Sequence, residues 1–210
     1  VIELSGGLLL AMALDRVTQA RGLVRTAVLL PWAIPTVVVA LVWRFMFESP
    51  GGLANALLAG AGLGTPTWFA DAAAAWVPLL LADAWKTTPF VAILLLAGLQ
   101  TIDRTLYEAA EVDGAGAWRQ FADITLPLLK PALLVAGLFR SLDAFRVFDL
   151  VYVMTGGGPG TATEPIALYT FITLLQNLRF GLGSALSIVV FAVAFFFALG
   201  VIRLFGSGAF

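Results

Sequence analysis

The sequence predicts an all-α protein embedded in a membrane, and three observations lead to that prediction. The chain has 210 residues, of which 60% are hydrophobic, whereas soluble domains average about 45–50% apolar residues. Only 12% of its residues are charged, about half of the usual share of roughly 25%. Apolar runs also recur along the chain at lengths near the roughly 20 residues that a helix needs to cross a bilayer.

Five membrane-spanning helices are expected along the chain. In order, they are Val1–Leu14, Thr26–Trp43 with an extension to Phe47, Trp76–Leu99, Pro131–Met154 and Phe180–Ile202. The first run begins at once, with Val1 in place of a methionine. We therefore expect a sixth span upstream in the full-length chain, and we treat residues 1–210 as one N-terminally incomplete transmembrane domain.

The positive charges predict which side of the membrane each connection faces. Connections on one side carry Arg16, Arg21, Arg25, Arg104, Arg119, Lys130 and Arg203. The connections on the other side, at about residues 48–75 and 155–179, carry only Arg179. Because cytoplasmic loops are enriched in Lys and Arg, the arginine-rich side is expected in the cytoplasm. Residues 165–178 are too short to span and are expected to form an external or partly re-entrant helix.

Two missing residue types exclude several kinds of chemistry. The chain has no His and no Cys, which excludes a disulfide framework, a cysteine nucleophile and the usual zinc sites. A Ser-His catalytic pair is excluded for the same reason. The sequence also lacks the G-x-x-x-x-G-K-[ST] loop that cradles nucleotide phosphates. With a net charge of −1 and no basic run, nothing indicates a nucleic-acid partner.

A polar segment, residues 103–127, interrupts the apolar pattern. Good helix formers fill Tyr107 to Gln120, while Gly114 and Gly116 are expected to bend or end a short helix because glycine disfavours helix interiors. A second short helix is expected from about Ala117 to Thr125. Pro127 and Pro131 are expected to start a new helix, since proline is tolerated in a first turn. The simplest alternative is an ordinary solvated loop.

The residues in this segment carry a resemblance to a known family. "EAAEVDGA", a short spacer and "ITLP" resemble the EAA motif of binding-protein-dependent ABC importer permeases. "GLVRTAVLLPWAIPTVVVALVWRFMF" and "FGLGSALSIVVF" are similar to the sugar-importer branch of the MalF/SugA kind. The resemblance implies a MetI-like permease core whose polar segment is a cytoplasmic coupling helix. The residues it assigns to ATPase coupling are Glu108, Ala109, Ala110, Asp113, Gly114, Leu126 and Pro127.

The same resemblance implies the partners. Two separate ATP-binding subunits would hydrolyse ATP with Mg²⁺, so this chain would be non-catalytic and bind no cofactor itself. A second permease subunit, a heterodimeric partner, would complete the membrane portion. An extracytoplasmic solute-binding protein would deliver the sugar. The expected location is the cell membrane, or inner membrane, of a bacterium or archaeon, with the chain in contact with lipid.

Charged residues within the apolar runs are the second group of candidate functional residues. Arg140, Asp143, Arg146 and Asp149 recur every three residues, and Asp83 and Lys86 have the same spacing. Aromatic residues lie among them, namely Trp85, Phe139 and Phe145. Ionisable groups in a span mark either a pathway or a buried pair. Both interpretations stay open: structural ion pairs between spans, or a water-filled sugar pathway.

The local sequences favour a particular class of solute. "WKTTPF" and "LFRSLDAFRVFD" are similar to trehalose- and maltose-type importers, which implies a disaccharide. An ion- or proton-coupled transporter working alone is the main alternative, because Asp83, Asp143 and Asp149 could carry protons. An intramembrane enzyme is disfavoured by the absence of His and Cys.

Overall fold

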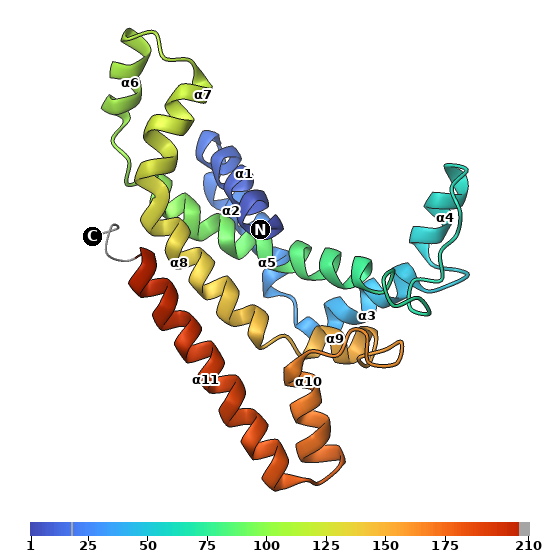
Figure 1. Ribbon diagram of the computed structural model, residues 1–210. Coiled ribbons are helices and arrows are strands. Elements are labelled where there is room, and N and C mark those ends of the chain that lie inside the picture. Colours follow the sequence, from blue (N-terminus) through green and yellow to red (C-terminus); the bar gives the residue numbers. More distant parts are fainter. Residues whose placement is uncertain (18, 206–210) are drawn as a thin grey trace. The chain divides into compact units, whose positions relative to one another are not determined.

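The computed structural model describes residues 1–17 and 19–205, and every regular element in those ranges is helical (Figure 1). The elements are α1 (Ile2–Arg16), α2 (Arg21–Ala33), α3 (Thr36–Phe47), α4 (Leu53–Gly60), α5 (Trp76–Leu99), α6 (Arg104–Val112), α7 (Ala117–Gln120), η1 (Phe121–Thr125), α8 (Leu126–Phe145), α9 (Asp149–Met154), α10 (Ile166–Phe171), η2 (Ile172–Gln176) and α11 (Phe180–Phe205). Both η elements are single π-helical turns. The prediction of an all-α fold is confirmed.

The chain divides into two compact units, each with its own core. Of the described residues, the first unit contains 1–17, 19–32, 87–141 and 197–205, and the second contains 33–86 and 142–196. In the first unit, buried residues of α1, α5 and α8 form one apolar cluster, with Leu95 and Leu129 fully buried. In the second, α3, α5, α9 and α10 contribute to another, centred on Ala40, Met154 and Leu168.

The helices confirm most of the expected membrane spans. Three are long and apolar enough to cross a membrane: Trp76–Leu99, Ala117–Phe145 and Phe180–Arg203. The α2–α3 pair makes a fourth if the two helices form one broken span. The first expected span, Val1–Leu14, corresponds to α1, which has 15 residues and so falls short of the roughly 20 that a full crossing requires.

The expected continuous span Pro131–Met154 is interrupted in the structure. Helix α8 ends at Phe145 and α9 begins at Asp149, because Phe148 leaves the helical region at φ −139° and ψ −65°. The last turn of α8 tightens, with the Arg146 amide donating to the Asp143 carbonyl at 3.0 Å. No glycine or proline lies within residues 138–154, so no local sequence feature marks this break.

The expected helix start near Pro127 matches α8, which begins at Leu126, whereas Pro131 lies inside α8 and the helical path before Leu126 is not interrupted. The helical path from Ala117 continues through both prolines to Phe145. The π-helical turn η1 directly precedes Pro127, and the Leu126 amide donates to the Phe121 carbonyl. A wider turn at this point leaves room before the proline ring, which would otherwise clash with the preceding turn of an α-helix. The short helix expected over Ala117–Thr125 is present as α7 and η1.

Glycines permit close contact between helices of the first unit. A Cβ added at Gly7 of α1 would lie 2.5 Å from Val91 Cγ1 of α5. One added at Gly98 of α5 would lie 2.5 Å from the Cβ of Ala132 on α8. Small residues let membrane helices approach closely, which is a main source of helix association in lipid. Both α1 and α8 therefore pack closely on α5, α1 at Val91 and α8 at Gly98.

We predict that Gly7→Ala lowers the stability of the protein by about 1–3 kcal/mol, because the added methyl group overpacks the α1–α5 contact. Gly200→Ala on α11 is the matched control, since nothing lies within 4 Å of a Cβ at that position. The control is expected to be neutral or to gain up to about 1 kcal/mol from helix propensity. Thermal unfolding of the purified protein measures both. Equal midpoints for the two variants would contradict the close contact.

Candidate functional site

The polar segment 103–127 begins with a capped helix. Asp103 is the N-cap of α6, and its side chain accepts a hydrogen bond from the Thr105 amide at 2.9 Å. This hydrogen bond to the ionised carboxylate lowers the pKa of Asp103. The cap therefore operates above the ordinary pKa of an aspartate and is lost only as the pH falls through the lowered value.

The end of α6 is set by a Schellman motif. The Ala115 amide donates to the Ala110 carbonyl at 2.8 Å, and the Gly114 amide donates to the Glu111 carbonyl at 3.0 Å. Gly114 has φ +76°, in the left-handed region that favours glycine. Gly116 differs, because as N-cap of α7 it has an extended backbone at φ −70° and ψ 166°, which any residue can adopt. Of the two glycines that were expected to bend or end the helix, only the one at position 114 has a backbone conformation that favours glycine.

The side chains expected to contact an ATPase lie around this turn. Glu108 and Ala109 are exposed on α6, Ala110 is half-buried, and Asp113 is the exposed C-cap. Leu126 and Pro127 are exposed in the first turn of α8. The sequence analysis placed all of them in one helix–turn–helix segment, and the structure confirms that local arrangement. Their role in coupling remains a prediction.

Two exposed apolar residues beside the turn were missed by the sequence analysis. Val112 is 89% exposed at the end of α6, and Trp118 is 78% exposed on α7. Trp118 packs its ring against Phe121 with centroids 5.7 Å apart. The available signal for a contact surface was the presence of these two apolar residues within a polar segment, because exposed apolar side chains that gather on a surface mark contact sites.

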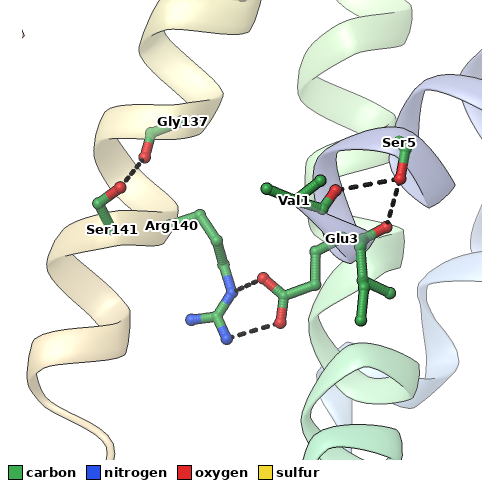
Figure 2. Close-up of polar contacts among 7 residues, drawn as sticks. Val1, Glu3, Ser5, Gly137, Arg140 and Ser141 are labelled. Carbon is green, nitrogen blue, oxygen red and sulfur yellow. Dashed lines mark hydrogen bonds and ion pairs between the residues drawn. The ribbon is translucent and has the colours of Figure 1, made fainter.

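Arg140 forms an ion pair that the sequence analysis did not anticipate. Its guanidinium faces the Glu3 carboxylate of α1, with Nε donating to Oε2 and Nη2 donating to Oε1 at 2.8 Å (Figure 2). The two side chains are 11% and 16% exposed. This bidentate geometry is the strong form of a charge-assisted pair. For Arg140, the structure favours a structural pair between helices over a solute contact.

Lys86 and Arg44 bind main-chain carbonyls at helix ends. Lys86 Nζ donates to the Ile34 carbonyl at 2.6 Å, directly after the end of α2 and before Pro35, where the helix is interrupted. On α3, Arg44 Nη1 donates to the Val153 carbonyl at 2.9 Å, in the last turn of α9. Cations at helix C-termini satisfy carbonyls that the helix leaves open and complement its dipole.

The other predicted pathway residues are distributed between the two units. Phe139 lies in the first unit and is 57% exposed. The remainder, Asp83, Trp85, Asp143, Phe145, Arg146 and Asp149, belong to the second unit. In it, Trp85 is 44% exposed and lies 6.2 Å from Trp43, centroid to centroid. Asp143, Arg146 and Asp149 are exposed around the break between α8 and α9.

The glycine-rich segment 155–163 is held by its threonines. The hydroxyls of Thr155 and Thr163 lie 2.8 Å apart, and Thr163 Oγ1 donates to the Gly158 carbonyl at 2.8 Å. Thr163 is fully buried. A segment of this composition is often irregular and mobile, yet this one forms a defined turn with exposed residues at its tip, including Gly160 and Thr161.

Comparison with known proteins identifies the class. A model of the family described as "Binding-protein-dependent transport system inner membrane component" matches residues 4–208. The trehalose/maltose transport system permease protein MalF of Thermococcus litoralis is 46% identical over 194 residues, covering 92% of this chain and 65% of that protein. The sulfoquinovosyl glycerol transport system permease protein SmoG of Agrobacterium fabrum is 45% identical over 170 residues, covering 81% of this chain and 55% of that protein.

A solved structure shows the same fold. The crystal structure of a bacterial alginate ABC transporter in complex with an alginate pentasaccharide-bound periplasmic protein aligns with a TM-score of 0.82 and 29% identity, covering 96% of this chain and 71% of the matched chain. The fold and the helix–turn–helix polar segment thus define a transport-system membrane component. The chain belongs to the binding-protein-dependent transport system inner membrane component family. It spans 55–65% of the length of the two relatives described above.

We predict that Glu3→Gln alone destabilises the protein by about 3–5 kcal/mol, because it leaves the Arg140 guanidinium buried without its carboxylate. The double variant Glu3→Gln with Arg140→Gln should recover most of that loss, since it removes both charges. Unfolding midpoints of the parent, both single variants and the double variant measure the coupling. Strictly additive losses would show that the two residues do not pair.

Proposed function

We propose that the chain is the permease subunit of an ATP-driven importer that carries a sugar across the membrane. The observation that carries the proposal is the EAA-like motif in a helix–turn–helix segment of a chain that belongs to a binding-protein-dependent transport family. The chain has no nucleotide-binding loop of its own, so the energy would come from partner subunits. In this proposal the chain is non-catalytic.

The polar segment would face the cytoplasm and contact a separate ATP-binding subunit. The contact would include polar and small side chains of the first helix and its turn, namely Glu108, Ala109, Ala110 and Asp113. It would also include Leu126 and Pro127 at the start of α8. The exposed Val112 and Trp118 would add an apolar centre, because tryptophan is enriched among the residues that dominate interfaces. Two such subunits would bind ATP with Mg²⁺, and their closure would move this segment together with α8.

The proposed solute is a neutral disaccharide or a related glycoside. MalF of T. litoralis is named for trehalose and maltose, and the two local sequences similar to that branch favour the same class. Asp83, Trp85, Asp143, Phe145, Arg146 and Asp149 would supply polar groups and ring faces in the second unit, and Phe139 an exposed ring in the first. Lys86 and Arg140 would support the pathway mainly through their own structural contacts.

Other subunits complete the proposed transporter. A second permease subunit would pair with this chain in the membrane of a bacterium or archaeon, because importers of this class require two membrane halves. An extracytoplasmic binding protein would deliver the sugar near the segment 155–163, and the alginate transporter structure, which contains a periplasmic protein, supports such a partner. The alternative of an ion- or proton-coupled transporter predicts uptake without any ATPase subunit.

We predict that Gly114→Val weakens the association with the ATPase subunit and lowers uptake by about tenfold, because a β-branched residue at φ +76° disrupts the Schellman turn. Gly116→Val is the matched control, since its extended backbone accepts valine and nothing lies within 4 Å of either position. Co-purification of the ATPase and sugar uptake measure the effect. The same uptake for both variants would refute the coupling role of this turn.

Substrate uptake tests the sugar assignment and the energy source together. Cells that contain the whole transporter should accumulate radiolabelled trehalose or maltose, and deletion of the ATPase subunit should abolish that uptake. Sucrose, alginate oligosaccharide and sulfoquinovosyl glycerol serve as comparison solutes. Uptake that persists without the ATPase subunit would favour the ion-coupled alternative, whereas ATPase-dependent uptake of a comparison solute alone would correct the sugar but keep the transporter class.

A further inference from the structure

A cavity in the first unit is surrounded by an unusual number of arginines. It has a volume of about 660 Å³ and lies between the connection from α1 to α2 and the polar segment. Arg16, Arg21, Arg25 and Arg104 line it, and the carboxylates of Asp15, Glu108 and Glu111 line it as well. The lining therefore carries four positive and three negative charges, with a net charge of +1.

The arginines are not neutralised by those carboxylates. In the described part of the chain, no arginine of the cavity lies within 4 Å of one of the cavity's carboxylates, and the pairs Arg119–Asp123 and Arg140–Glu3 lie elsewhere. Arg21 Nε donates to the Val17 carbonyl at 2.8 Å, which positions its guanidinium. Arg25 Nε is buried and has no hydrogen-bond partner among the described residues, and a buried donor without a partner is unfavourable.

The cavity also has an apolar side, located at helix ends. Met12 belongs to the last turns of α1, Leu99 is the last residue of α5, and Ile102 follows shortly after it. α5 is long and apolar enough to span a membrane, so its end lies near the membrane surface. The cavity therefore combines guanidinium groups with apolar side chains beside the end of a helix that is long and apolar enough to span a membrane.

We propose that this cavity binds the phosphate group of an anionic phospholipid. Guanidinium groups match phosphate oxygens in charge and in geometry, and basic pockets at the membrane surface between transmembrane helices are suited to anionic headgroups. Arg25 and Arg21 hold the phosphate, while Met12 and Leu99 contact the start of the acyl chain. The phosphate lies on the Arg21 and Arg25 side of the cavity, because the carboxylates of Glu108 and Glu111 in the same lining repel it. The inference does not depend on the identity of the transported solute.

Lipid retention by the assembled transporter tests the proposal. The parent, purified from bilayers of phosphatidylcholine with added phosphatidylglycerol, should retain phosphatidylglycerol in native mass spectra. Arg21→Gln with Arg25→Gln should lower that retention at least about tenfold, since each basic residue near an anionic surface contributes roughly a fivefold change. Lys130→Gln is the matched control, because Lys130 is exposed on α8 outside the cavity. Arg25→Lys, which keeps the charge, should retain more lipid than the double variant.

A second experiment distinguishes a bound phospholipid from a soluble phosphate anion as the ligand of this cavity. Inorganic phosphate is titrated into lipid-depleted transporter while thermal unfolding is followed. Stabilisation of the parent but not of the double variant, without a difference in lipid retention, would keep the phosphate site and assign it to a soluble anion. Equal lipid retention and equal phosphate response in the parent and the double variant would overturn the proposal. Loss of the ATPase subunit with both anion responses unchanged would also overturn it and assign the arginines to that subunit's acidic side chains.

Discussion

Every polar group placed in a membrane needs a partner inside the protein, and the positions of several helices in this chain follow from that constraint. A charged or hydrogen-bonding group in hydrocarbon has no water to satisfy it. Arg140 meets the requirement with Glu3, which joins α8 to α1 in the first unit. In the second unit, Arg44 on α3 binds the Val153 carbonyl of α9. Each contact joins one helix to another.

The interruption between α2 and α3 shows the same constraint acting on the backbone. Pro35 disfavours helical geometry at Ile34. The Val38 amide, which would donate to the Ile34 carbonyl in a continuous helix, donates to the Pro35 carbonyl at 3.0 Å instead. Lys86 of α5 donates to the Ile34 carbonyl at 2.6 Å. A lysine that the sequence marks as functional thus stabilises a broken helix. The break and the cation are two parts of one feature, although 52 residues separate Ile34 from Lys86.

The sequence predicted local features well and long-range pairs poorly. The bounds of α5, Trp76–Leu99, match the expected span, because a long and predominantly apolar run determines a membrane helix through local composition. The end of α6 near Gly114 was also predicted, since a Schellman turn requires a residue that tolerates positive φ. By contrast, the regular spacing of the charged residues did not identify Glu3 as a partner of Arg140, because the two residues lie 137 positions apart. The break after Phe145 had no glycine or proline to mark it, and the continuous helix through Pro127 depended on a π-helical turn that spacing does not reveal.

The most direct test of this account is the thermal unfolding of Lys86→Met, measured in the purified transporter with and without saturating sugar. If Lys86 stabilises the helix break, the variant loses about 1–3 kcal/mol through the unsatisfied Ile34 carbonyl, and the loss is the same with and without sugar. If Lys86 instead contacts the solute, the variant unfolds like the parent in the absence of sugar and loses only the stabilisation that bound sugar provides. That second result would contradict the account.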